Sequence, residues 1–240
     1  MIHETQQFVS SLAFNQIREP KIYVDEKVES ITIGTERMYL QKLRDGTKKL
    51  LEDVESRYVK LTRGNKVLTR MPDDVLDDLA DTRRGYSFIR EEPFRSKQHS
   101  LLLFLVEEYR LAMVDGSGRI AWDIPEVKNF LIKSARVWEP LYHLIYLTVH
   151  VSSRGTQFID HQISNADRHR NLFMQGSEMF IITGYSKTTN ARDLDSCTPG
   201  FLPRKVAEWA LEMLGGGLRS AEAILAGIAY GEEAEHLYKT

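Results

Sequence analysis

Apolar side chains recur at helical spacing along several stretches of the chain. They fall mostly on one face over residues 35–58, which predicts a helix whose weakest point is Gly46. Residues 101–114 are apolar nearly all round, as is typical of a buried helix. A second apolar stretch, residues 141–151, predicts a central core helix, because Pro140 is expected to break or kink the helix before it.

Prolines and acidic residues mark the predicted helix starts. The clearest start is at Asp123, which can cap a helix, with Pro125 in the first turn and Glu126 three residues after the cap. A similar pattern, Pro72 followed by acidic residues, predicts a short helix over residues 71–80.

The pattern changes to short strands in the later part of the chain. The runs "NLFM" and "EMFIIT" flank "QGS", and a Gln-Gly turn between two such runs predicts a β-hairpin. Residues 1–34 alternate only weakly, so they predict no more than an irregular extended segment.

The order of the elements indicates the fold class. Pro203 opens a predicted helix that runs to about Leu214 and ends at a run of glycines, and the rest of the chain keeps helical spacing. We therefore expect an α+β, mostly helical fold: a helical N-terminal part, then helices around a small antiparallel hairpin sheet. The turn-rich stretch 115–119 is the predicted boundary between a helical region, residues 1–115, and a second domain, residues 120–240.

The composition excludes several classes of protein. With 240 residues, 42% of them hydrophobic, the chain can build a core and does not have a disordered composition. A net charge of −2 gives no global basic field, so any contact with nucleic acid has to be local. The longest apolar runs fall well short of the roughly 20 residues that span a bilayer, so we expect no membrane association. A single cysteine, Cys197, and an N-terminus without a secretory pattern predict an intracellular protein, nuclear or cytoplasmic.

Two isolated basic residues are candidates for phosphate binding. Arg154, in "SSRGTQF", directly follows the apolar helix, where its guanidinium could bind a phosphate through paired hydrogen bonds or could interact with the last helix carbonyls. Lys187, in "YSKT", follows the hairpin and could reach a phosphate or be an ordinary solvated lysine. The residues alone leave both alternatives open.

The segment "FIDHQISNADRHRNLF" contains side chains that can bind metals. They are Asp160, His161, Asp167 and His169. Their spacing matches no compact ligand pattern, so we expect instead a basic loop in which Arg168 and Arg170 anchor a phosphate backbone. No glycine-rich nucleotide loop and no serine–histidine–acid set can be defended, and we expect no cofactor.

The order of four motifs resembles a known family. "RGTQF", "RNLFMQG", "YSKT" and "FLPRKVAEW" together resemble the first half of the catalytic domain of tyrosine recombinases of the phage-integrase type. They are still more similar to a group of fungal proteins from mobile elements or telomere-linked reading frames, some of which continue into RecQ-type helicases. The resemblance covers roughly residues 85–240, and its specificity comes from order and spacing because each motif is short.

This resemblance implies roles for three residues. In tyrosine recombinases, arginines stabilise the charge on the phosphate, a hairpin lysine protonates the leaving oxygen and a tyrosine attacks. Arg154 would match the first arginine and Lys187 the hairpin lysine. Gln157 stands where the family usually has a glutamate that braces the fold, so the arginine is expected to be held less firmly.

The rest of the family's active site is missing from the sequence. No His-x-x-Arg follows Pro203, and His236 and Tyr238 are too close together to take the later roles. We therefore expect a truncated or decayed element protein that does not cleave DNA on its own.

The expected partner is DNA, bound weakly through phosphates, with other recombinase or helicase chains as further candidates. The residues expected to contact DNA are Arg154, Arg168, Arg170 and Lys187. Two alternatives remain: a non-enzymatic helical protein-interaction domain, and a metal-dependent hydrolase that uses Asp160, His161 and His169.

Overall fold

The computed structural model describes residues 22–68, 72, 75, 77–149, 161–183 and 198–234. The chain divides into two compact units, Met1–Lys49 and Leu50–Thr240, and each is described by itself. Both contain helix and antiparallel sheet, and the fold is α+β and mostly helical, as predicted.

The first unit contains a three-stranded antiparallel sheet in the order β1-β2-β3. Its strands are β1 (Ile22–Val24), β2 (Ser30–Ile33) and β3 (Glu36–Tyr39). Asp25 holds the turn between the first two strands, because its carboxylate accepts hydrogen bonds from the Glu29 amide at 2.8 Å and the Ser30 hydroxyl at 2.6 Å. The weak alternation in the sequence therefore corresponds to real strands.

Helix α2 (Leu40–Thr62) begins later than the apolar pattern predicted. Residues 36–39 pair with β2 as a strand, and the helix can start only where this pairing ends. In the second unit, α2 contributes Val54, Tyr58 and Leu61 to a hydrophobic core.

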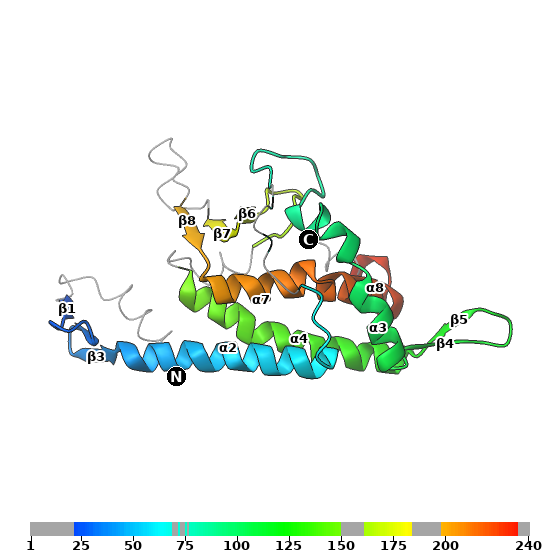
Figure 1. Cartoon of the computed structure of the whole chain (residues 1–240), viewed down its shortest axis with the longest axis horizontal. Coiled ribbons are helices and arrows are strands. Elements are labelled where there is room, and N and C mark those ends of the chain that lie inside the picture. The colour runs from blue at the N-terminus through cyan, green and yellow to red at the C-terminus, as the bar shows by residue number, and fades with distance from the viewer. Residues whose placement is uncertain are drawn as a thin grey trace. The chain divides into compact units, whose positions relative to one another are not determined.

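In the described part of the second unit there are four further helices. They are α3 (Ser100–Glu108), α4 (Ile124–Thr148), α7 (Arg204–Gly215) and α8 (Leu218–Tyr230), with short 3-10 turns η1 (Phe88–Arg90) and η2 (Arg95–Lys97). Helix α8 contacts α3, α4 and α7, and α7 also contacts α4 (Figure 1). None of the helices in the described part of the chain is long and apolar enough to cross a membrane.

Helix α4 begins as predicted and continues where a break was predicted. The Asp123 carboxylate caps it by accepting a hydrogen bond from the Glu126 amide at 3.1 Å. The helix then runs through Pro140 without interruption, which corrects the expectation of two separate helices. Proline has no N–H for the carbonyl four residues earlier. That carbonyl, on Arg136, accepts a hydrogen bond from the Arg57 guanidinium of α2 at 2.7 Å instead.

The apolar stretch 101–114 is not one helix. Helix α3 ends at Glu108, and the chain then forms a two-stranded hairpin of β4 (Ala112–Val114) and β5 (Ile120–Trp122). Residues 115–119, the stretch expected to be a domain boundary, form the turn of this hairpin.

The predicted β-hairpin is confirmed, and it has a third strand. The sheet has the antiparallel order β6-β7-β8, with β6 (Leu172–Gln175), β7 (Glu178–Thr183) and β8 (Thr198–Phe201). The turn between β6 and β7 contains Gly176 at φ +59°. One face of the sheet packs into the helical core through Leu172, Met174, Met179 and Ile181.

The junction between α7 and α8 also follows the sequence. Pro203 precedes α7, and the helix ends at Gly215 with Gly216 after it. Gly217 has φ +95°, and an added Cβ would lie 2.8 Å from the Gln98 carbonyl oxygen, so only glycine fits there. The short helix predicted over residues 71–80 is not present among the residues described there, which are irregular or in a turn.

Candidate nucleic-acid interface

The two leading candidates for phosphate binding, Arg154 and Lys187, lie outside the described residues, as does Gln157. The described elements next to them can be placed. Arg154 follows the end of α4, and Lys187 falls between β7 and β8, which pair with Thr183 opposite Thr198. Both α4 and β7 pack against α7.

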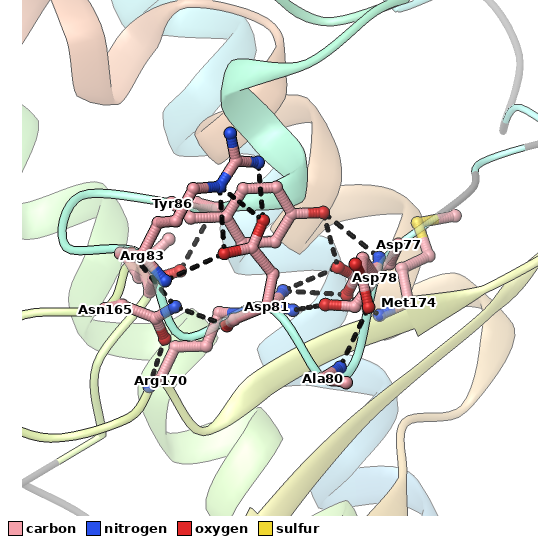
Figure 2. A network of polar contacts seen from close by, with 11 residues as sticks. Asp77, Asp78, Ala80, Asp81, Arg83, Tyr86, Asn165, Arg170 and Met174 are labelled. Atoms are coloured by element: carbon pink, nitrogen blue, oxygen red, sulfur yellow. Dashed lines mark hydrogen bonds and ion pairs between the residues drawn. The ribbon is translucent and has the colours of Figure 1, made fainter.

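Arg170 is buried and does not lie on a basic surface. It is 2% exposed, and its guanidinium forms an ion pair with Asp77 at 2.7 Å. Its second terminal nitrogen donates to the Asp78 carbonyl at 2.8 Å (Figure 2). The expectation that Arg170 contacts a DNA backbone is therefore corrected: its guanidinium is buried, and both terminal nitrogens are directed at groups of the protein itself.

The carboxylate of Asp77 is the centre of this buried network. Besides Arg170 it accepts a hydrogen bond from the Met174 amide at 3.0 Å, on strand β6. The hydroxyl of Tyr86 approaches the same carboxylate at 3.4 Å and accepts from the Asp78 amide at 3.0 Å. Burial is the main cause that raises the pKa of Tyr86 above its ordinary value, so the phenol stays neutral.

Asn165 joins the network to the loop before Tyr86. Its side-chain amide donates to the carbonyls of Asp81, at 2.7 Å, and Arg83, at 3.2 Å, and its side-chain oxygen accepts from the Arg170 amide at 3.1 Å (Figure 2). At the exposed edge, hydrogen bonding from Arg83 is the main cause that holds the pKa of Asp81 below its ordinary value. These bonds fix the loop against the sheet, which indicates a structural role.

Arg168 is exposed, in the loop before Arg170. Its neighbour Asp167 forms an ion pair with Arg84 at 3.3 Å. Among the residues that the structure describes, no group of three or more His, Cys, Asp or Glu side chains is placed to hold a metal ion. Asp160, one of the metal candidates, lies outside the described residues. His236 and Tyr238, which the sequence excluded from the later recombinase roles, lie outside them too.

Two further carboxylates are buried, and both hold elements together. Glu212 on α7 accepts hydrogen bonds from Tyr58, at 2.6 Å, and from the amides of Val67 and Leu68, both at 2.8 Å. This carboxylate therefore anchors the chain after α2 to α7.

Glu222 on α8 is the second buried carboxylate. It accepts hydrogen bonds from Ser134 and from Trp138, the latter at 2.8 Å, both on α4. Burial outweighs these donors and raises the pKa of Glu222 above its ordinary value. Its partners come from the protein on two packed helices, so a role in helix packing explains it.

The outer face of the sheet carries a row of phenylalanines that the sequence did not identify. Phe173 lies opposite Phe180, and Phe180 lies opposite Phe201, so their rings line one face of three strands. The ring centroids are 5.7 Å and 5.3 Å apart. The two-residue turn fixes the register of the first pair and could have revealed it, whereas nothing in the sequence shows that β8 joins the sheet.

Comparison with protein-family models, with curated proteins and with solved structures gave no match. The function is therefore argued from the residues and their geometry.

Proposed function

We propose that the chain binds DNA through phosphate contacts from Arg154 and Lys187, as a recombinase-like module of the kind carried by mobile or telomere-associated elements. The observation that carries the proposal is the order of the described elements: a long helix with one buried face before Arg154, an antiparallel strand pair around Lys187, and a helix opened by Pro203. This order is the one that the resemblance to tyrosine recombinases requires.

The described elements that flank the two residues in the chain support a shared site. Because Thr183 pairs with Thr198, the segment that carries Lys187 leaves and re-enters the sheet at one place. Since α4 and β7 both pack on α7, the elements that precede Arg154 and Lys187 in the chain are neighbours.

The chemistry of the two side chains suits a phosphate. A guanidinium can donate two parallel hydrogen bonds to one phosphate, and an ammonium on a flexible stem adds a point charge. Exposed Arg168 is a third candidate contact, whereas buried Arg170 no longer is. A few contacts on a chain of net charge −2 predict weak, salt-sensitive binding without sequence preference.

The test is a titration of a fluorescently labelled DNA duplex, followed by anisotropy at several salt concentrations from about 50 mM upward. We expect Arg154→Ala with Lys187→Ala to weaken binding, and to reduce the slope of log K against log salt by about 1.8, because each phosphate contact contributes about 0.9. The matched control, Arg119→Ala with Lys133→Ala, removes the same charge from exposed positions of the described helices and hairpin. No binding at low salt, or the same loss in the control, would refute the proposal.

A protein-interaction domain remains the second candidate. It is favoured by the β4–β5 hairpin, which projects from the helices in Figure 1 and exposes Met113 (71%), Val114 (71%) and Ile120 (63%). Exposed apolar clusters of this kind often mark contacts with other proteins. This function predicts no DNA affinity, so the same titration separates it from the first.

A further inference from the structure

Five planar groups form one continuous row across the outer face of the sheet, and the last ring, Phe201, is tilted by 40° from Phe180. The guanidinium of Arg170 lies between the rings of Tyr86, at 4.8 Å, and Phe173, at 4.6 Å. Phe173 stacks on Phe180 with 19° between the ring planes, and Phe201 continues the row. The row therefore has a closed end at Tyr86 and an open end at Phe201.

The open end is the part that a ligand can reach. Phe173 and Phe180 are 7% and 6% exposed, whereas Phe201 is 51% exposed. The closed end is held in place because Asp77 pairs with Arg170 inside the protein. Phe201 thus presents an aromatic surface at the end of a rigid row, and a planar ligand that extends the row needs little reordering of the protein.

Positive charge lies beside this ring. Arg204 and Lys205 follow β8 at the start of α7, and their side chains are 73% and 71% exposed. Both pair with the same carboxylate, Glu208, at 3.3 Å and 2.8 Å, so two cations share one anion. The pairs are solvent-exposed and therefore weak, and a polyanion can compete for either cation.

We propose that Phe201 stacks on an unpaired base of single-stranded nucleic acid while Arg204 and Lys205 bind the neighbouring phosphates. An aromatic ring at a sheet surface beside basic groups is the usual platform for unstacked bases. Bases of a duplex are already stacked on one another and cannot occupy this position. This inference rests on the proposed function, because both take nucleic acid as the ligand. It differs in the residues that bind and in the form bound, which is single-stranded and not duplex.

The first test measures binding of a labelled oligothymidine of about twelve nucleotides to the full chain by anisotropy. We expect Phe201→Ala to weaken binding about ten-fold, the usual effect of losing one stacked base. Phe201→Leu should weaken it similarly, because leucine has no ring to stack on a base. Leucine keeps the apolar contact with Phe180, so this loss would not come from a disturbed sheet. Leu103→Ala is the matched control, since Leu103 is 75% exposed on α3, and it should bind like the parent chain. Equal affinity of Phe201→Leu and the parent chain overturns the proposal.

The second test detects stacking directly. Phe201→Trp should retain binding, and its added fluorescence should be quenched by the oligothymidine but not by inorganic polyphosphate, which carries charge without bases. Quenching by both polymers would show attraction to charge alone and would overturn the proposal. Oligouridine in place of oligothymidine distinguishes RNA from DNA as the source of the base, and quenching by either one supports the site.

The two proposals can fail separately. Phe201→Ala should leave duplex binding unchanged, and Arg154→Ala with Lys187→Ala should leave the Phe201→Trp quenching in place. Absence of duplex binding by the parent chain refutes the proposed function, whereas absence of ring-dependent single-strand binding refutes this inference.

Discussion

The buried ion pair between Asp77 and Arg170 permits a sharp prediction about stability. The two side chains are 0% and 1% exposed, and their charged groups are 2.7 Å apart. Asp77→Ala removes the carboxylate and leaves the guanidinium of Arg170 buried among Tyr86 and Phe173 without an opposing charge. The Met174 amide also loses its acceptor.

The expected loss of unfolding free energy is large. Removing one partner of a buried ion pair costs about 3–5 kcal/mol, because the remaining charge is uncompensated. A surface pair contributes at most about 1 kcal/mol. Arg84→Ala provides that comparison, since Arg84 pairs with Asp167 at 3.3 Å and the two side chains are 72% and 87% exposed. The large loss should therefore be specific to the buried pair.

Urea unfolding followed by tryptophan fluorescence is the suitable assay. The chain has 3 tryptophans, at positions 122, 138 and 209, and all lie within the unit Leu50–Thr240, so the signal reports that unit. With a urea dependence of about 2–3 kcal/mol per molar, Asp77→Ala should lower the midpoint by roughly 1.5 M. Arg84→Ala should shift it by less than about 0.5 M.

A double variant tests whether the pair acts as a unit. Asp77→Ala combined with Arg170→Met removes both charges and keeps an apolar side chain between the rings, so it should be more stable than Asp77→Ala alone. Simple addition of the two single losses, or a midpoint for Asp77→Ala within about 0.3 M of the parent chain, would refute the reasoning.

Further predictions concern the other buried groups. Glu222 has a raised pKa, so the folded state holds its proton where the unfolded carboxyl has lost it, and stability should fall as pH rises above about 4.5 and through the raised value. Glu222→Gln should flatten this dependence, as urea midpoints at about pH 5 and about pH 8 would reveal. Glu212→Ala leaves the Val67 and Leu68 amides without acceptors, so it should cost about 3 kcal/mol and speed hydrogen exchange at both. Gly217→Ala should be clearly more destabilising than Gly118→Ala in thermal unfolding, because both have positive φ but an added Cβ has no atom within 4 Å at Gly118; equal losses would contradict the close contact at Gly217.

Local signals in the sequence predicted local structure well. Asp123 and Pro125 marked the start of α4, and the Gln-Gly turn marked the β6–β7 hairpin, because caps and tight turns depend on a few neighbouring residues. The prediction of one helix over residues 101–114 was wrong. A short helix and the strand that follows it are both apolar there, so in the sequence they form one continuous apolar run.

The candidate site shows where sequence reasoning stops. Arg170 has the appearance of a surface cation in the sequence, and only tertiary structure brings Asp77 to it. Phe201 joins Phe180 through strand pairing across a long connection, which no local pattern indicates. The roles of Arg154 and Lys187 stay predictions, which the DNA titrations test.

The proline within α4 has a consequence for how the helices pack. Because Pro140 has no N–H, the carbonyl of Arg136 has no partner within α4, and the guanidinium of Arg57 on α2 donates a hydrogen bond to it. Sliding α2 by one helical turn would move its side chains about 5.4 Å along the axis, and the guanidinium would then face carbonyls that already have partners. The proline thus selects one register of α2 against α4, because only in that register does Arg57 meet a free carbonyl. A helix without the proline would present the same hydrogen-bonded backbone at every turn and would favour no register.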